Sequence, residues 1–237
     1  MRPILLKGHE RPLTQVKYNR EGDLIFSSAK DHHVCAWYST NGERLGTYNG
    51  HKGSVWSVDV DSNTEYIITA SADFSGKLWR AQTGECIFTW NFDAPVKRVE
   101  FSPDNKYVFF LTDHVMGQLG KILIFEIDLS KDANQKSEPI LEIVNKGDAL
   151  VKPTIATWSY SAKYILAGNA DGSISKFDSK TGEELDRQTP FKKTITDIQT
   201  SSDRSYFIVA SKDQTSKIFD VDTFKQLKEF ESDAPVN

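Results

Sequence analysis

The sequence predicts an all-β protein that is built from about five repeated, four-stranded units. Short landmarks recur at a shift of 42 residues, because Gly8-His9 returns as Gly50-His51 and Trp37 returns as Trp79. Between these landmarks apolar and polar residues alternate over short segments, which is typical of half-buried β-strands, and no helical stripe competes with them. Internal repetition of strand-like segments indicates a repeat architecture.

Each unit contains four short segments in the same order. The first segments alternate in polarity and read "LTQVKYN", "VWSVDVD", "VKRVEFS", "PTIATWS" and "ITDIQTS". The second segments are apolar and β-branched: "LIFSSAK", "YIITASA", "YVFFLTD", "YILAGNA" and "YFIVASK". The third segments end in an aromatic residue, as in "VCAWY", "GKLWR", "KILIFEI", "SISKF" and "TSKIF". The fourth follows a turn in which Gly42, Gly84 or Gly182 supplies the positive φ of a tight hairpin.

Four strands in about 42 residues, with Gly-His before them and an aromatic residue near their end, predict a WD40 β-propeller blade. The whole chain, 1–237, is then one propeller domain. The predicted units cover approximately 8–49, 50–92, 93–147, 148–190 and 191–232. The tetrapeptide "DAPV" opens the third unit at Asp93 and recurs at Asp233, so residues 233–237 are expected to begin a sixth unit.

The third unit is the irregular one. Its third segment is delayed by the residues "HVMGQLG", which we expect to form a longer loop. A second insertion, "DLSKDANQKSEP", is polar and ends in Pro139, so it is expected to form an exposed excursion.

Composition favours an intracellular, soluble protein, and we expect a cytoplasmic one. The net charge of −4 argues against a generally basic surface for nucleic acids. No apolar run approaches the roughly 20 residues of a membrane helix, and the N-terminus lacks the apolar core of a signal peptide. Cys35 and Cys86 are far apart in apolar runs, so we expect two buried free thiols in a reducing compartment.

The two histidines of the Gly-His dipeptides suggest a metal ligand or a general base, but a structural role fits better. In such blades the histidine bonds a strand hydroxyl and a turn aspartate, and the tryptophan N–H completes the chain, because buried polar groups must be paired. The predicted blade networks are His9, Ser27, Asp31 and Trp37 in the first unit, and His51, Thr69, Asp73 and Trp79 in the second. The later units lack the histidine and should depend more on apolar packing.

No motif predicts catalysis, a metal or a cofactor. The adjacent pair His32-His33 would diverge on a strand, and no further ligand lies at a suitable spacing. The stretch "GQLGK" has Val115 and Ile122 where a phosphate loop needs Gly and Ser or Thr. Neither a nucleophile elbow nor a zinc-protease motif occurs. We therefore expect no catalytic residue, no metal and no cofactor.

Surface recognition is the remaining class of function. Lys192-Lys193 could touch RNA, but two lysines contribute little salt-dependent attraction, so a solvated loop and no sequence-specific nucleic-acid binding are expected. Turns of the fifth unit carry Asp203, Asp220 and Asp222 near Phe224, which predicts an acidic patch beside an exposed aromatic residue. A basic, aromatic-bearing partner helix would suit such a patch.

Beyond the blade pattern, the stretches "MRPILLKGHERPLTQVKYNREGDLIFSSAKD", "GHKGSVWSVDVDSNTEYIITASAD" and "KLWRAQTGE" closely resemble the WD-repeat subunit i family of eukaryotic translation initiation factor 3. The resemblance continues through "FDAPVKRVEFSPDN" and "GNADGSISKFDSKTGEEL" and covers essentially the whole chain. It implies a seven-bladed propeller that is a non-catalytic component of the factor 3 complex on the small ribosomal subunit. It also implies contacts with subunits b and g, no membrane association, and a role in assembling preinitiation complexes.

Two expectations follow from setting five units beside a seven-bladed family. The chain is expected to be C-terminally incomplete, with "PILLKG" as the outer strand of a final blade and with sticky edges at the opening. The alternative function is another intracellular WD40 adaptor, of the receptor-associated or ubiquitin-ligase type, although no additional adaptor domain is visible.

Overall fold

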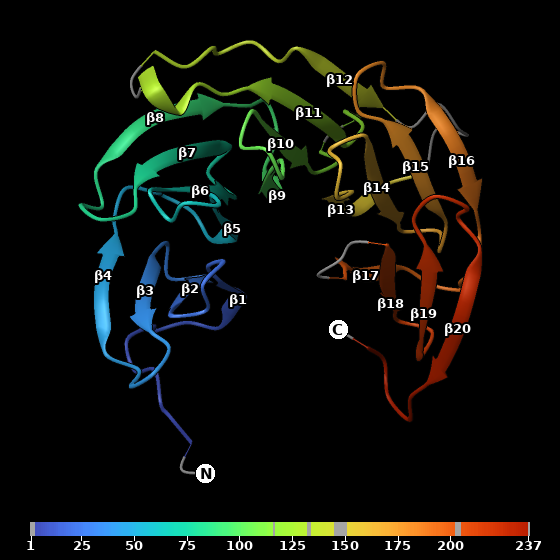
Figure 1. Ribbon diagram of the computed structural model, residues 1–237, viewed down its shortest axis with the longest axis horizontal. Coiled ribbons are helices and arrows are strands. Elements are labelled where there is room, and N and C mark those ends of the chain that lie inside the picture. Colours follow the sequence, from blue (N-terminus) through green and yellow to red (C-terminus); the bar gives the residue numbers. More distant parts are fainter. Residues whose placement is uncertain (1–2, 116, 132–133, 145–150, 202–204, 237) are drawn as a thin grey trace. The chain divides into compact units, whose positions relative to one another are not determined.

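The computed structural model describes residues 3–115, 117–131, 134–144, 151–201 and 205–236. Within these ranges the chain forms twenty β-strands in five four-stranded sheets, with one short 3₁₀ helix. Consecutive strands pair within each sheet, and Figure 1 shows these strands lying side by side, for example β13 to β16. The predicted all-β propeller class is confirmed.

The first two sheets correspond to the first two predicted units. Sheet 1 contains β1 (Leu13–Tyr18), β2 (Leu24–Ala29), β3 (Val34–Tyr38) and β4 (Arg44–Tyr48). Sheet 2 contains β5 (Val55–Val60), β6 (Tyr66–Ser71), β7 (Ser75–Arg80) and β8 (Cys86–Asn91). All neighbouring strands in them are antiparallel.

The remaining sheets repeat this order. Sheet 3 contains β9 (Val96–Phe101), β10 (Tyr107–Thr112), β11 (Lys121–Glu126) and β12 (Leu141–Val144), with the 3₁₀ helix η1 (Leu129–Lys131) before β12. Sheet 4 contains β13 (Pro153–Trp158), β14 (Tyr164–Asn169), β15 (Ile174–Asp178) and β16 (Glu184–Gln188). Sheet 5 contains β17 (Ile195–Thr200), β18 (Tyr206–Ser211), β19 (Thr215–Asp220) and β20 (Gln226–Glu231).

The chain divides into two compact units. The first comprises residues 1–112 and 124–140 and holds sheets 1 and 2 and most of sheet 3. The second comprises residues 113–123 and 141–237 and holds sheets 4 and 5. Within the described ranges no helix is long and apolar enough to cross a membrane.

Turn glycines set the hairpins between the third and fourth strands, as predicted. Gly42, Gly84 and Gly182 have φ values of 73°, 73° and 71°. Glycine adopts this left-handed conformation without the steric cost that a Cβ adds. The amide of each also donates to the carbonyl of the residue four positions earlier, as Gly84 does to Arg80 at 3.0 Å.

Burial follows strand position within each sheet. Every residue of β6 is buried, whereas every residue of β20 is exposed. The second and third strands therefore supply most of the core, with large side chains such as Trp37, Trp79 and Phe177 that are at most 2% exposed. β20 is an edge strand with both faces exposed, and four of its six residues are polar or charged, although Leu227 and Phe230 are exposed as well.

The first strand of each sheet carries a β-bulge at its second residue. The register with the second strand shifts at Thr14, Trp56, Lys97, Thr154 and Thr196. A bulge leaves one residue unpaired and re-aims its side chain.

Three of these bulged residues are threonines that bond the next repeat. The hydroxyl of Thr14 donates to the Val55 carbonyl at 2.5 Å, and that of Thr154 donates to the Ile195 carbonyl at 2.7 Å. In the same way the Thr196 hydroxyl donates to the Val236 carbonyl at 2.9 Å. Val236, in the second "DAPV", thus accepts the same hydrogen bond from sheet 5 that Val55 and Ile195 accept at the start of their first strands.

Polar side chains on β1 and β5, the first strands of sheets 1 and 2, also accept hydrogen bonds from the next sheet. Gln15 Oε1 accepts from the Val58 amide at 3.0 Å, and Ser57 Oγ accepts from the Val99 amide at 3.2 Å. Asp59 Oδ2 accepts from the Phe101 amide at 2.8 Å. These bonds fix the position of each first strand against its neighbour.

An ion pair adds to this linkage between sheets 1 and 2. Lys17 Nζ lies 2.7 Å from Asp59 Oδ1. Burial opposes the charge on Lys17, but attraction to Asp59 and Glu100 outweighs it, so the pKa of this ammonium is raised above its ordinary value.

One prediction about exposure is wrong. Both cysteines are unpaired and Cys35 is buried, but Cys86 is exposed because it begins the outer strand β8. The prediction of an exposed excursion before Pro139 is confirmed for most of its described residues, since only Gln135 among them is buried. Its described part receives hydrogen bonds from Tyr66 Oη at the Leu129 carbonyl, 2.8 Å, and from Trp90 Nε1 at the Lys136 carbonyl, 2.9 Å.

We predict that Gly76→Ala destabilises the first unit because Gly76 lies directly against the ring of Phe110. A Cβ at this position would approach Phe110 Cζ to 2.6 Å, and the ring is fully buried. Overpacking of this kind costs about 1–3 kcal/mol. Gly46→Ala is the matched control, since its Cβ would meet nothing within 4 Å. Urea unfolding should show a lower midpoint for Gly76→Ala only, and equal midpoints would contradict the close contact.

Candidate functional site

The predicted polar residues of sheet 1 form one continuous hydrogen-bonded chain. His9 Nδ1 lies 2.8 Å from Asp31 Oδ2, and His9 Nε2 lies 2.9 Å from Ser27 Oγ. Trp37 Nε1 donates to the same Ser27 hydroxyl at 2.7 Å. The turn that follows β2 positions Asp31, and the strands themselves position Ser27 and Trp37.

Sheet 2 repeats this chain and extends it. His51 lies 2.9 Å from Asp73 Oδ2 and 2.7 Å from Thr69 Oγ1, and Trp79 Nε1 donates to Thr69 at 2.9 Å. Ser75 donates to Asp73 Oδ1 at 2.6 Å and also lies 3.2 Å from His51 Nδ1. The sequence comparison missed Ser75 because its counterpart in sheet 1, His33, is not a hydroxyl residue.

The turn aspartates are stabilised as carboxylates. Burial opposes the charge on Asp73, but hydrogen bonds from His51, Ser75 and the Lys52 amide outweigh it and lower its pKa well below the ordinary value. The pKa of Asp31 is lowered in the same way, because bonds from His9 and two backbone amides outweigh its burial.

Sheets 3 and 5 fill the same core positions with apolar side chains. In sheet 5, Phe191, Val209 and Phe219 stand where sheet 2 has His51, Thr69 and Trp79, and all three are buried. In sheet 3 the corresponding residues are Phe92, Phe110 and Phe125, whose rings contact one another with centroids 5.0 to 6.0 Å apart.

Sheet 5 nevertheless keeps the turn aspartate. Asp213 accepts from the Lys192 amide at 2.8 Å and from the Thr215 hydroxyl at 2.6 Å, and these bonds outweigh burial and lower its pKa. The aspartate therefore organises the turn even where no histidine is present.

These geometries define what the two histidines can do. Both ring nitrogens of His9 and of His51 already contact protein oxygen atoms. A general base or a metal ligand needs a free nitrogen lone pair facing its substrate or ion. The arrangement therefore suits a structural bond network.

Two of the three aspartates of the predicted acidic patch in sheet 5 lie among the described residues. Asp220 caps its own turn, because its carboxylate accepts from the Thr223 amide at 2.7 Å and from the Thr223 hydroxyl at 2.8 Å. The hydrogen bond donated by the Thr223 backbone amide is the main cause of the lowered pKa of Asp220. Asp222 is exposed on the same turn, and Asp203 lies outside the described residues.

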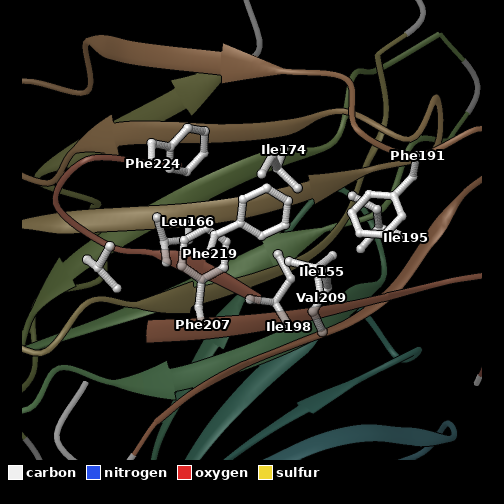
Figure 2. Close-up of a cluster of buried hydrophobic side chains, with 11 residues drawn as sticks. Ile155, Leu166, Ile174, Phe191, Ile195, Ile198, Phe207, Val209, Phe219 and Phe224 are labelled. Carbon is white, nitrogen blue, oxygen red and sulfur yellow. The ribbon is translucent and has the colours of Figure 1, made fainter. Parts of the chain in front are cut away.

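The expectation that Phe224 is an exposed aromatic residue is wrong. Phe224 is 1% exposed, and its ring lies 5.6 Å from that of Phe207 and 6.4 Å from that of Phe219. Figure 2 shows it inside the apolar cluster that also contains Leu166. A φ of 57° directs this side chain into the core, and sequence alone did not indicate that.

Other candidate positions gather no ligand set. His32 and His33 precede β3 in a turn, with φ of 74° at His32, and so they are not on a strand as assumed. Among the residues that the structure describes, no three His, Cys, Asp or Glu side chains are grouped as metal ligands.

Comparison with known proteins places the chain in a family. The EIF3I family model matches residues 1–237. The chain belongs to this family. Eukaryotic translation initiation factor 3 subunit I of Meyerozyma guilliermondii is 50% identical over 245 residues, covering 100% of this chain and 70% of that protein. The proteins of the same name from Aspergillus oryzae and Candida glabrata are 52% and 49% identical, with the same coverage.

A solved structure supports the fold independently. The β-propeller domain of Cps50 (Swd1) from Myceliophteria thermophila superimposes with a TM-score of 0.77 at 18% identity, covering 94% of this chain and 74% of that one. Such low identity shows the fold alone. The family assignment therefore depends on the subunit I relatives, and it does not favour the alternative of an unrelated WD40 adaptor.

We predict a pH-dependent role for Asp73. Its folded-state pKa is lowered, so its contribution to stability is complete above the unfolded-state pKa of 3.8 and is lost as pH falls below that value. Asp73→Asn should lower the free energy of unfolding by about 2–3 kcal/mol at pH 7, since hydrogen bonds to charged groups are the stronger ones. Urea unfolding at several pH values should show this difference shrinking below about pH 4. A difference that stays constant down to pH 2.5 would contradict the ionic role.

We also predict that the polar chain of sheet 2 is strongly non-additive. His51→Phe alone leaves Asp73 and Thr69 without their imidazole partner and should cost about 2 kcal/mol or more. Adding Thr69→Val and Trp79→Phe, which reproduces the residues of sheet 5, should cost at least about 1 kcal/mol less than the sum of the three single changes. Urea unfolding of all four variants measures this coupling, and simple additivity would refute it.

Proposed function

We propose that this chain is a non-catalytic interaction subunit of eukaryotic translation initiation factor 3. The observation that carries this proposal is family membership across all 237 residues, with relatives near 50% identity that are named as subunit I of this factor. In this role it supports assembly of preinitiation complexes on the 40S ribosomal subunit and recruitment or scanning of mRNA.

The structure supports a role in binding more than one in chemistry. The imidazoles of His9 and His51 are committed to bonds within their sheets. Rigid β-sheets joined by short turns present fixed surfaces that suit docking of helices or extended peptides. We propose that the partners are subunits b and g of factor 3, that the 40S subunit is reached through the complex, and that the protein works in the cytoplasm.

We propose the exposed turn of sheet 5 as one contact for a partner. Asp220 and Asp222 place two carboxylates on this turn, and Thr223 holds the Asp220 carboxylate in position. A basic helix would complement this charge. Because Phe224 is buried, the proposed contact is electrostatic and does not include an aromatic anchor from this side.

Affinity purification of the chain from its own cells, with mass spectrometry of the bound proteins, tests the assembly. Co-purification of other factor 3 subunits and of 40S proteins is the expected result. Recovery of ubiquitin-ligase or receptor components in their place would overturn the proposal.

We predict that Asp220→Lys/Asp222→Lys weakens capture of a factor 3 partner by about tenfold, with a stronger effect at low salt because the contact is electrostatic. The double variant Asp186→Lys/Glu231→Lys is the matched control, because it changes the net charge equally on exposed positions of β16 and β20. Quantitative pull-down measures both. Equal loss in the two variants, or no loss in the first, would remove the proposed contact.

A further inference from the structure

Sheet 2 carries an exposed aromatic residue at two positions where the sheets like it have other residues. The first is the bulged residue of its first strand, Trp56, which is 37% exposed. The second is Phe74, which follows the turn aspartate Asp73 and is 42% exposed. Both positions belong to the first compact unit, so their surroundings can be described together.

The two rings lie at the same end of sheet 2. The bulge is at the second residue of β5, and β5 begins where β6 ends, since Val55 pairs with Ser71. The Ala72 amide donates to the Ser54 carbonyl at 2.9 Å, which joins the segment before β5 to the turn that carries Phe74.

The fold does not require a tryptophan at the bulge. The equivalent residues Thr14, Thr154 and Thr196 each donate a hydroxyl hydrogen bond to a carbonyl of the next repeat. The side chain of Trp56 has no hydroxyl group and cannot make this bond. Sheet 2 therefore presents an aromatic ring at a position where a threonine would link two sheets.

The fold does not require a phenylalanine after the turn aspartate either. The equivalent residues in sheets 1, 4 and 5 are His32, Gly172 and Gln214, with φ values of 74°, 85° and 75°, and Phe74 has a φ of 66°. A bulky residue in this left-handed region costs free energy. Phe224 offsets the same cost by complete burial, at 1% exposed, whereas much of the Phe74 ring remains in solvent.

An exposed lysine lies close to each ring. Lys30 Nζ lies over the Trp56 ring, 5.6 Å from its centroid. The Lys52 amide donates to Asp73 Oδ2 at 2.8 Å, so Lys52 is held beside the turn that carries Phe74. Both lysine side chains are exposed.

Charge differs between the two ends of sheets 1 and 2. At the end with the rings, the exposed cations exceed the exposed carboxylates: Arg11, Lys30 and Lys52 against Glu10 and Asp93. At the opposite end, exposed carboxylates exceed exposed cations: Glu21, Asp23, Glu43, Glu65 and Glu85 against Arg20 and Arg44. A polyanion is therefore repelled less at the end that carries the rings.

We infer that this end of sheet 2 binds single-stranded RNA without reading its sequence. Bases stack on the exposed rings of Trp56 and Phe74, and every base has a face that can stack. The ammonium groups of Lys30 and Lys52 contact phosphates. Neither contact distinguishes one base from another, so the expectation of no sequence-specific nucleic-acid binding is retained.

Single-stranded RNA fits the surface better than other polyanions. An acidic peptide would neutralise the two lysines but would leave both rings without a stacking partner. In a duplex the bases already stack on one another, so they do not reach an aromatic side chain. The inference goes beyond the proposed subunit contacts, because it concerns a different surface and is tested on the purified chain alone.

Fluorescence anisotropy with a labelled RNA of eight uridines tests the binding chemistry on the full chain. Saturable binding is expected, with a slope of about −1.4 for log K against log salt, because two phosphates contribute about −0.7 each in single strands. An octamer of the same sugar-phosphate backbone without bases should bind at least about tenfold more weakly, and so should a peptide of eight glutamates. No saturable binding of the RNA, or equal binding of either competitor, would overturn the inference.

Replacing the rings tests stacking. Trp56→Thr and Phe74→Gly introduce residues that other sheets have at these positions, so both variants should fold, and each should weaken RNA binding by about fivefold or more. Tyr38→Thr is the matched control, because Tyr38 is 40% exposed but lies at the opposite end of sheet 1, at the end of β3. Equal effects of the control and of the two folded variants would refute stacking at this end.

Replacing the lysines tests the phosphate contacts, and it decides the question if a ring variant does not fold. Lys30→Ala/Lys52→Ala should weaken RNA binding by about tenfold at low salt and bring the salt slope close to zero. Lys192→Ala/Lys212→Ala is the matched control, because both residues are exposed at the equivalent turns of sheet 5, which has no aromatic residue at either equivalent position. An equal loss in the two double variants would show that charge alone is responsible and would refute the inference.

Ultraviolet crosslinking in extracts of its own cells tests the contact in the assembled state. Residues 53–77 form one tryptic peptide that contains both rings, because Lys52 and Lys77 bound it. RNA-linked fragments of the chain should include this peptide. RNA linked only to other peptides of the chain, or to none, would contradict the inference. Recovery of factor 3 subunits is scored in the same extract, so failure of the proposed function is seen separately.

Discussion

The fold depends on hydrogen bonds that join the first strand of one sheet to the first strand of the next. A β-bulge turns a threonine hydroxyl toward the carbonyl of the following first strand at Thr14, Thr154 and Thr196. Each such bond contributes only about 1 kcal/mol, but it requires one register between successive sheets. Gln15, Ser57 and Asp59 add bonds to backbone amides of the next first strand. Within each compact unit this requirement fixes the position of one first strand against the next, and the recurrence of Thr154 as Thr196 reflects it.

The equivalent core positions near the turn are filled by polar side chains in some sheets and by apolar side chains in others. Sheets 1 and 2 fill it with a histidine, a hydroxyl and a tryptophan that satisfy one another, and sheet 5 fills it with Phe191, Val209 and Phe219. Both solutions leave no polar atom of the set without a partner, which is the condition for burial at acceptable free energy. The turn aspartate is common to both because it serves the backbone amides of the turn, as Asp213 shows.

Repetition made the fold and the polar networks predictable from sequence. Residues such as Asp31 and Asp73 recur at one shift, and the chemistry of a buried imidazole then requires partners of a definite kind. The errors at Phe224 and Cys86 have another cause, because they concern which way one side chain points. A phenylalanine with positive φ contradicts the usual preference for glycine, so the pattern at Gly42, Gly84 and Gly182 could not reveal that Phe224 turns inward. The hydrogen bonds that hold the exposed insertion before Pro139 to sheets 2 and 3 were also missed, since they are made by main-chain carbonyls, which every sequence has.

The strained phenylalanine is informative about the chain as a whole. A non-glycine residue in the left-handed region costs on the order of 1 kcal/mol or more, and such a conformation persists where the surrounding contacts outweigh that cost. Complete burial of the Phe224 ring against Phe207 provides those contacts, so filling this place between two sheets is favourable. At the counterpart with Gly84 the ring of Tyr48 packs instead; this residue is 3% exposed, and its ring centroid lies 6.1 Å from that of Trp79. Equivalent places between successive sheets are thus filled by a residue of the turn in one case and by a residue of the fourth strand in the other. The fold therefore requires that the place is filled, but it does not fix which residue fills it.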